Sequence, residues 1–305
     1  MIAMHTLAQE DNYYMGYDIG GTKCSIVLGG KDFEVHEKIV FPTHTERGYQ
    51  EIIAEFKRHS YKLFEKYDKN KLVKIGISCG GPLDSDKGII YSPPNLPGWD
   101  SVPIVDIFKE EFGVEVEVQN DANACALAEW MMGAGVGTKN MIFLTFGTGM
   151  GAGLILNEKL YTGTNDLGGE VGHMRMAEDG PVGFGKAGSF EGFCSGGGIA
   201  QLAKSMISAQ LKSGEKVGFC PSEALIGDIT ASYLGKGLAI LIDILNPECI
   251  VIGSIYARNE AYLKPLVEKV IENEAIPSAS AVCKVLPAAL GESIGDFAAL
   301  CVALN

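Results

Sequence analysis

The pattern of apolar positions along the chain predicts strands that alternate with helices. Short buried runs that end at glycine, such as 73–78 and 249–252, are typical of strands inside a sheet, whereas the helical spacing over 49–67 predicts a helix. Such alternation indicates an α/β protein with mostly parallel sheets. The same reasoning predicts strands over 14–19, 24–28, 114–118, 141–145 and 151–156, and helices over 102–112, 122–132, 199–210, 231–245 and 297–304.

The two halves of the chain begin with the same plan. Segments 14–28 and 141–156 each read as strand, small polar turn and returning strand. At roughly 150 residues per domain, the 305 residues suggest two domains. No linker rich in proline, serine or charge divides them, so we expect the halves to share a cleft.

The negative net charge of the chain disfavours anionic partners. The chain has 25 Lys and Arg against 38 Asp and Glu, a formal net charge of -13, which repels nucleic acid and anionic membrane surfaces. The longest uncharged run, 140–157, contains four glycines, and no segment reads as membrane-spanning. No secretory signal precedes Tyr13, so a cytoplasmic protein is expected. The cysteines form no C-x-x-C pair and are expected to be free thiols: Cys24, Cys79, Cys125, Cys194, Cys220, Cys249, Cys283 and Cys301.

The first polar turn combines groups that suit a phosphate. Asp18 ends a predicted strand, Gly20 and Gly21 lack a Cβ, and Thr22 and Lys23 add a hydroxyl and an ammonium. A turn of this kind can hold phosphate while the carboxylate holds hydrated magnesium. The residue order does not match a Walker loop. A plain hairpin turn remains the alternative.

The second polar turn, 145–153, offers threonine hydroxyls and exposed N–H groups, with Thr148 and Gly149 at its centre. It fails the dinucleotide-binding pattern, because Ala152 follows and no helix pattern begins there. Two such turns, one in each half, would suit the phosphates of a nucleoside triphosphate.

Asn120 and Asp121 lie between a predicted strand and a predicted helix. Either residue could simply cap that helix. Alternatively, Asp121 is a base that orients and deprotonates an attacking hydroxyl. An aspartate of ordinary pKa, about 3.9, is ionised at neutral pH and suits phosphoryl transfer.

A glycine-rich segment places Glu170 and His173 three residues apart, and Glu191 follows further along. Carboxylate and imidazole groups around one pocket suit a polyhydroxylated ligand, since each hydroxyl can donate and accept. A hydrogen-bonded loop histidine and a helix N-terminal carboxylate are the alternatives.

Together these segments resemble the ROK (repressor, ORF, kinase) family of bacterial glucokinases and related sugar kinases. The most specific pieces are 18–23, 95–99, 120–124, 147–151 and 169–173, in the family's order. The resemblance implies an actin-like ATPase (ribonuclease H-like) fold, with two related α/β domains flanking a cleft. It places an N-terminal domain at 13–122, with a C-terminal helix 291–305 packing back on it, and a C-terminal domain at 123–290.

The resemblance also implies an ATP-dependent kinase acting on a hexose or N-acetylhexosamine, with O6 as the acceptor. Glucose, N-acetylglucosamine, N-acetylmannosamine, fructose and allose remain open, as does polyphosphate as the donor. It further implies a homodimer and Mg²⁺ held by Asp18 through water. Asp121 would be the base, and Asn120, Glu170, His173 and Glu191 would hold sugar hydroxyls, with Asn95 and Gly81 near them. The nucleotide contacts would be Gly20, Gly21, Thr22, Lys23, Thr148 and Gly149, with adenosine near Gly196, Gly197 and Gly253.

The chain departs from the family where many members bind structural zinc. Val182, Phe184 and Ser189 replace the three thiols, so no zinc is predicted, and Val182 and Phe184 are expected to pack the loop by burial. Ser254 replaces a usual glycine.

The alternatives to a kinase are two. The family includes sugar-responsive repressors, but no basic footprint for DNA is visible in this chain. A catalytically silent sugar-sensing protein is opposed by the joint presence of Asp18, Lys23 and Asp121.

Overall fold

The computed structural model describes residues 12–213 and 223–305. Cys220 and the segment read for a secretory signal lie outside these residues. The chain divides into two compact units, each described here by itself. The first comprises Met1–Met132, Thr162–Asp166 and Glu292–Asn305, and the second Gly133–Tyr161 and Leu167–Gly291. A boundary between residues 122 and 123 would cut a helix that runs from Asp121 to Met132.

The sheet of the first unit has five strands in the order β3-β2-β1-β4-β7. β1 pairs antiparallel with β2, and β2 with β3, whereas β1, β4 and β7 run parallel. The sheet places the carboxyl ends of β1 and β7 at the same edge, with Asp18 near one end and Asn120 at the other. The strands are β1 Tyr13–Ile19, β2 Lys23–Gly29, β3 Val35–Pro42, β4 Leu72–Cys79 and β7 Glu115–Asn120.

The sheet of the second unit repeats this order as β10-β9-β8-β13-β14, with the same directions. Its strands are β8 Met141–Leu144, β9 Ala152–Leu156, β10 Lys159–Tyr161, β13 Cys249–Ile252 and β14 Lys284–Pro287. Each sheet is therefore mixed, and the expectation of mostly parallel sheets is wrong. The short polar turns that open each half can only join antiparallel neighbours, because a parallel connection needs a long crossover.

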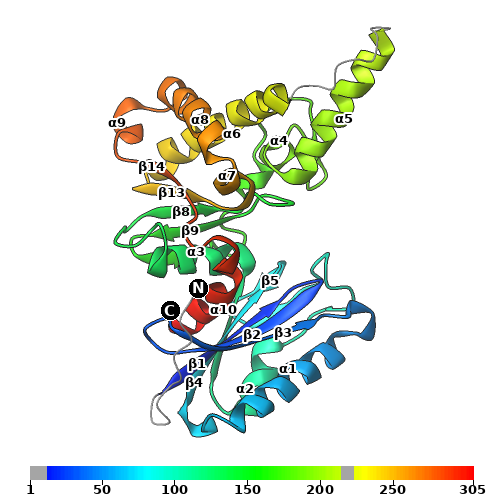
Figure 1. The fold of residues 1–305 in the computed structure, drawn as a ribbon, viewed down its shortest axis with the longest axis vertical. Coiled ribbons are helices and arrows are strands. Elements are labelled where there is room, and N and C mark those ends of the chain that lie inside the picture. The colour runs from blue at the N-terminus through cyan, green and yellow to red at the C-terminus, as the bar shows by residue number, and fades with distance from the viewer. Residues whose placement is uncertain (1–11, 214–222) are drawn as a thin grey trace. The chain divides into compact units, whose positions relative to one another are not determined.

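In the first unit, helices cover both faces of the sheet (Figure 1). α1 and α2 bury an aromatic cluster in which the Tyr17 ring lies 4.9 Å from Phe56 and 5.0 Å from Phe108. The Tyr17 hydroxyl is satisfied by Ser60 Oγ at 2.6 Å, as a buried polar group requires. α3 and α10 pack together on the other face, although they lie far apart in the chain. The helices are α1 Tyr49–Phe64, α2 Ile104–Phe112, α3 Asp121–Met132 and α10 Ile294–Leu304.

Glycines on two strands let α10 approach the first sheet closely. A Cβ on Gly16 would lie 2.5 Å from the backbone nitrogen of Leu300, and one on Gly76 would overlap the carbonyl oxygen of Ala299. The face of α10 that meets these strands is almost fully buried from Phe297 to Ala303. Backbone therefore packs on backbone here, which only glycine permits.

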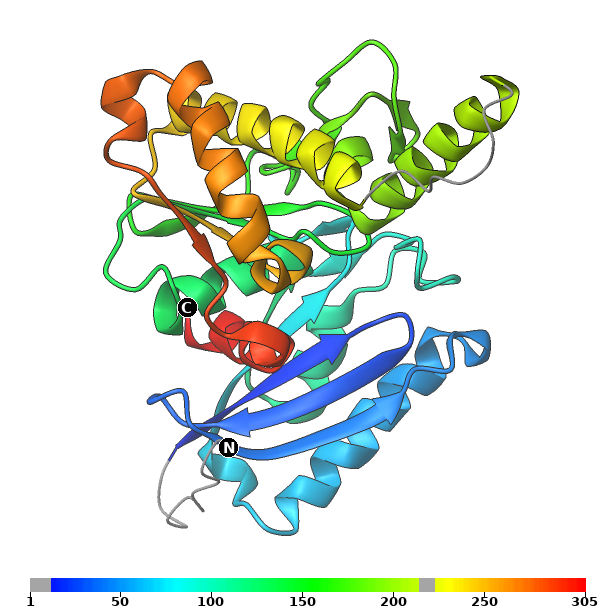
Figure 2. The same ribbon diagram turned by 45° about the horizontal axis from the view of Figure 1, so that its top comes forward.

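In the second unit, α6 and α8 pack side by side on the sheet (Figure 2) and form its core with β8 and β13. The window Leu225–Leu245 of α6 is long and apolar enough to cross a membrane, and half of it is buried inside the protein. The helices are α4 Phe190–Phe193, α5 Gly196–Ser213, α6 Glu223–Leu245, α7 Ser254–Arg258, α8 Glu260–Glu274 and α9 Pro277–Ser280.

The remaining elements are short. Two small hairpins are β5 Leu83–Asp84 with β6 Ile89–Ile90, and β11 Val182–Gly183 with β12 Lys186–Ala187. Within residues 12–213 and 223–305, the single turns of 3₁₀ helix are η1 Thr45–Arg47, η2 Lys69–Lys71, η3 Val171–His173 and η4 Gly291–Ser293.

Each strand and helix predicted from the apolar pattern is present, with bounds within about three residues of the expected range except for α6, which begins at Glu223 and not at 231. The described cysteines are free, as predicted, and Cys125 and Cys283 are only half-buried. The pattern did not predict β3, β10, β14, α8 and α9.

Candidate functional site

The turn between β1 and β2 is fixed by hydrogen bonds within the turn and with Thr43. The Gly20 N–H donates to the Lys23 carbonyl at 3.2 Å, and Thr43 Oγ1 donates to the Gly20 carbonyl at 2.6 Å. The Thr43 N–H also donates to the Thr22 carbonyl at 3.0 Å. Thr22 and Lys23 are exposed, so the hydroxyl and the ammonium are available to a ligand.

The loop that carries Asn95 packs directly on this turn. A Cβ on Gly21 would lie 2.7 Å from the Asn95 carbonyl oxygen. Leu96 and Trp99 are fully buried and fix the loop, which leaves Asn95 exposed. The Asn95 amide also lies beside Gly80, and Gly81 follows it. The structure therefore brings Gly21, Asn95 and the Gly80–Gly81 backbone together.

Asp18 lies next to the last residue of β1 in a concentration of negative charge. Its pKa is raised to about 6, chiefly by burial and then by Asp121 and Asp296, and Lys23 and Lys38 only partly offset this rise. Asp296 is itself paired with Lys38 at 2.6 Å. Carboxylate oxygens in such surroundings suit a hard divalent cation, because the cation offsets their mutual repulsion. Asp18 thus fits the predicted magnesium ligand.

Asn120 and Asp121 differ in their contacts at the start of α3, which bears on which of them caps the helix. Asn120 Oδ1 accepts the Asn123 N–H at 2.8 Å, which caps α3. Asp121 Oδ1 accepts the N–H of the adjacent Ala122 at 2.9 Å, so its hydrogen bonds are to backbone at the start of α3. The Asp121 side chain is open to solvent, yet the surrounding protein raises its pKa above the ordinary value by desolvation. A raised pKa makes this carboxylate a better proton acceptor than an ordinary aspartate.

In the second unit, the turn between β8 and β9 is tied to the start of α5. The Gly196 N–H donates to the Gly147 carbonyl at 2.8 Å, and the Gly197 N–H to the Thr148 carbonyl at 3.2 Å. Thr148 is exposed at the tip of this turn. The N-terminus of an 18-residue helix therefore lies against it, and helix N-termini favour anions.

Glu191 links this turn to the residues predicted to hold a sugar. Its Oε2 accepts the Met150 N–H at 3.0 Å and lies against Gly149. A Cβ on Gly172 would lie 3.3 Å from the Glu191 Cβ, so the segment with Glu170 and His173 packs beside the same residue. Glu170 and His173 are both exposed. The structure thus brings Thr148, Gly149, Glu170, His173 and Glu191 into one region of the second unit.

The segment that replaces the zinc-binding loop is a short hairpin whose apolar residues are not buried. Phe184 is 78% exposed and Val182 44% exposed, so the expectation that they pack the loop by burial is wrong. Hydrogen bonds fix the hairpin instead: the Gln201 amide accepts from the Val182 N–H and donates to its carbonyl, both at 2.9 Å. Ser189, at the third thiol position, caps α4 by accepting the Gly192 N–H at 3.0 Å.

A cavity of about 430 Å³ lies beside the predicted adenosine residues and was not predicted from the apolar pattern or the motifs. Ile199 follows Gly196 and Gly197 on α5, and Ile255 follows Gly253. Thr230, whose buried hydroxyl has no hydrogen-bond partner within the described chain, also lines it. Size and apolar lining suit a flat heterocycle. Its lining is Ile199, Ile226, Gly227, Thr230, Ile255, Asn259, Tyr262 and Leu263.

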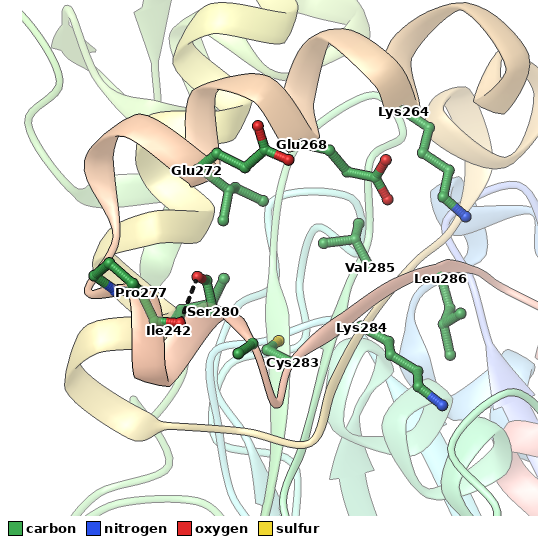
Figure 3. Close-up of a pocket in the computed structure, with 12 residues that line it drawn as sticks. Ile242, Lys264, Glu268, Glu272, Pro277, Ser280, Cys283, Lys284, Val285 and Leu286 are labelled. Carbon is green, nitrogen blue, oxygen red and sulfur yellow. Dashed lines mark hydrogen bonds between the residues drawn. The ribbon is translucent and has the colours of Figure 1, made fainter.

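A second cavity, of about 460 Å³, lies between α8, α9 and β14 (Figure 3) and contains none of the predicted site residues. Its charged groups, among them Glu268, Glu272 and Lys284, are exposed on its rim. The predicted residues instead form two groups. The first unit holds Asp18, Gly20, Gly21, Thr22, Lys23, Gly81, Asn95, Asn120 and Asp121, and the second holds Thr148, Gly149, Glu170, His173, Glu191, Gly196, Gly197 and Gly253.

Comparisons with known proteins bear on the family and the fold of the chain. The model of the ROK family matches residues 14–305. The glucokinase of Halalkalibacterium halodurans is 32% identical over 309 residues, covering 94% of this chain and 93% of that protein. A ROK family glucokinase from Streptomyces griseus, solved with glucose and AMPPNP, has a TM-score of 0.73 at 25% identity, over 96% of this chain and 99% of that one.

A ROK family transcriptional regulator, a homologue of the E. coli MLC protein, has a TM-score of 0.83 at 22% identity, over 96% of this chain and 78% of that one. At this identity the likeness concerns the fold alone. These neighbours and the two related sheets confirm the predicted actin-like ATPase fold. Because the family model extends from residue 14 to residue 305 and a glucokinase is 32% identical across nearly the same length, the chain belongs to the ROK family.

Proposed function

We propose that the protein is an ATP-dependent sugar kinase that transfers the γ-phosphate to O6 of a hexose or N-acetylhexosamine. The observation that carries the proposal is the division of roles at the start of α3. Asn120 caps the helix, which leaves the Asp121 carboxylate open to solvent with a raised pKa, in the unit that also holds Asp18 and Lys23. The glucokinase relatives support the same reaction class.

The acceptor would be held by groups that can match ring hydroxyls. Glu170, His173, Glu191 and Asn120 supply carboxylate, imidazole and amide groups, and the exposed Asn95 amide lies beside the Gly80–Gly81 backbone. A site that hydrogen-bonds each hydroxyl rejects analogues that lack one, because its own polar groups would be left unpaired. Binding of this kind orients one hydroxyl for attack.

The donor would be held by the two glycine-rich turns. Lys23 and Thr22 extend from the first turn, and the second turn is backed by the N-terminus of α5, so both favour phosphate oxygens. The cavity beside Gly253 would take the adenine, with the Thr230 hydroxyl as a partner for its ring nitrogens. Magnesium held by Asp18 through water would supply further charge neutralisation at the phosphates.

Asp121 would then accept the proton of the attacking hydroxyl. Phosphoryl transfer depends mainly on position and charge, since its transition state is loose and the proton leaves late. Desolvation raises the pKa of the Asp121 carboxyl group and so strengthens the carboxylate as a base.

A coupled assay of ADP release tests this proposal. MgATP is offered with a panel of hexoses and N-acetylhexosamines and a control without sugar. We expect turnover with at least one sugar in the wild type and a loss of orders of magnitude in Asp121→Asn, with sugar binding retained. Asp86→Asn, an exposed aspartate of the same unit, serves as the matched control with normal turnover.

Near-normal turnover of Asp121→Asn would reject Asp121 as the base. Silence across the whole panel, with sugars still raising the thermal stability, would reject the kinase and assign a sugar-sensing protein.

A further inference from the structure

We propose that Phe184 contacts the acceptor and selects a sugar that carries an N-acyl group, an inference that rests on the proposed sugar kinase function. The observation behind it is an aromatic ring that is 78% exposed beside His173. A side chain of this size normally lies in the interior, where its burial stabilises the fold.

The local backbone also disfavours phenylalanine at this position. Phe184 and Gly185 form the two-residue turn between β11 and β12, with φ of 44° and 74°. Two-residue hairpin turns with positive φ at both positions prefer asparagine, aspartate or glycine, because a bulky side chain is strained there. Phe184 therefore stabilises the fold neither by burial nor by favouring the turn. Backbone strain of this kind is typical of ligand-binding positions.

The hairpin is fixed to the residues proposed to hold the sugar. Lys186 Nζ donates to the His173 carbonyl at 2.7 Å. A Cβ on Gly183 would lie 2.7 Å from the Glu191 Cβ, so the hairpin packs closely on that residue as well. The Phe184 ring is thus presented from a rigid support rather than from a free loop.

The ring lies beside His173, with centroids 6.1 Å apart and planes at 81°. Side chains that hydrogen-bond the hydroxyls of a sugar lie around the edge of the sugar ring. The Phe184 side chain lies beside His173, so it would also meet that edge. An unsubstituted hexose presents hydroxyls and only small C–H groups there, which offer an aromatic ring less apolar surface than an acyl group does. An N-acyl group instead brings a methyl group and a planar amide, and both can pack on an aromatic surface. The geometry therefore favours an N-acylated hexosamine.

Binding without nucleotide tests this inference separately from catalysis. Isothermal titration would compare N-acetylglucosamine and N-acetylmannosamine with glucose and mannose. The test variant is Phe184→Asn, which removes the ring and suits the positive φ of 44°. The matched control is Val182→Ala, which shortens another exposed apolar side chain of the same hairpin.

We expect Phe184→Asn to lose about fourfold to tenfold in affinity for the N-acetyl sugar that the wild type prefers, since burial of one methyl group is worth about fourfold. Glucose and mannose should change less than twofold, and Val182→Ala should match the wild type. An N-propanoyl analogue should bind more tightly than the N-acetyl sugar to the wild type but not to Phe184→Asn. The thermal stability of Phe184→Asn should equal or exceed that of the wild type, which excludes a folding defect.

An equal loss for substituted and unsubstituted sugars, no loss at all, or no binding of N-acetyl sugars by the wild type would overturn the inference. Selective binding without turnover would uphold it while the kinase fails. Turnover of glucose with no preference for N-acyl sugars would uphold the kinase while the inference fails.

Discussion

Replacing Asp18 by asparagine should make the protein more stable while it removes activity. The pKa of Asp18 is raised from 3.8 to about 6, so the folded state holds this proton more tightly than the unfolded state. The stabilising contribution of the proton is complete below pH 3.8 and is lost as the pH rises through 6. At about 1.4 kcal/mol per pH unit, the ionised carboxylate costs up to about 3 kcal/mol at pH 8.

Urea denaturation in EDTA without nucleotide would measure this cost at pH 8 and at pH 4.5. Both tryptophans, Trp99 and Trp130, belong to the first unit, so their fluorescence follows the unit that contains Asp18. We expect Asp18→Asn to raise the free energy of unfolding by up to about 3 kcal/mol at pH 8 and by much less at pH 4.5. Asp86→Asn, which is exposed, should have no such effect.

A variant that is equally or less stable than the wild type at pH 8 would refute the reasoning. So would a gain that does not change with pH, because the whole effect depends on the ionisation of one carboxyl group.

Three further changes test other contacts. Asp296→Asn removes a negative charge near Asp18 and breaks the ion pair between Asp296 and Lys38, and both changes lower the pKa of Asp18. The acid limb of the pH profile of kcat/KM should therefore move to lower pH. A limb that does not move would contradict the electrostatic argument. Glu191→Ala removes the acceptor of the Met150 N–H, so the KM for ATP should rise roughly tenfold or more along with the KM for the sugar; Glu170→Ala, the comparison variant, should affect the sugar alone. Gly76→Ala places a Cβ against the backbone of α10 and should lower the free energy of unfolding of the first unit by about 1–3 kcal/mol, measured by tryptophan fluorescence in urea. An unchanged free energy of unfolding would show that α10 can shift at no cost.

The elements that the sequence predicts well are those whose signals are local. The opening hairpin of each half combines an apolar run with a glycine-rich turn, and both hairpins are present. α8 was not predicted, because charges and Pro265 interrupt its apolar pattern. β3 buries His36 and exposes Val40, so the polarity of its residues does not follow its burial and gives an equally weak signal.

The properties of the site depend on contacts that no local pattern contains. The pKa of Asp18 reflects Asp121 and Asp296, which lie far along the chain. The apolar cavity is built from four helices, so no single segment indicates it. Phe184 was expected to be buried because it is apolar, but its place in a two-residue turn decides its exposure.

The way in which α10 completes the first sheet also sets an order for biosynthesis. β1 and β4 leave the ribosome early, but the helix that covers them, Ile294–Leu304, is translated only after the whole of the second unit. Until then the strand surface that meets Leu300 has no cover, and exposed apolar surface in a nascent chain promotes aggregation. The first sheet can therefore be completed only after residues 294–304 have been synthesised. A truncation before residue 292 would yield a folded second unit joined to an unfinished first one.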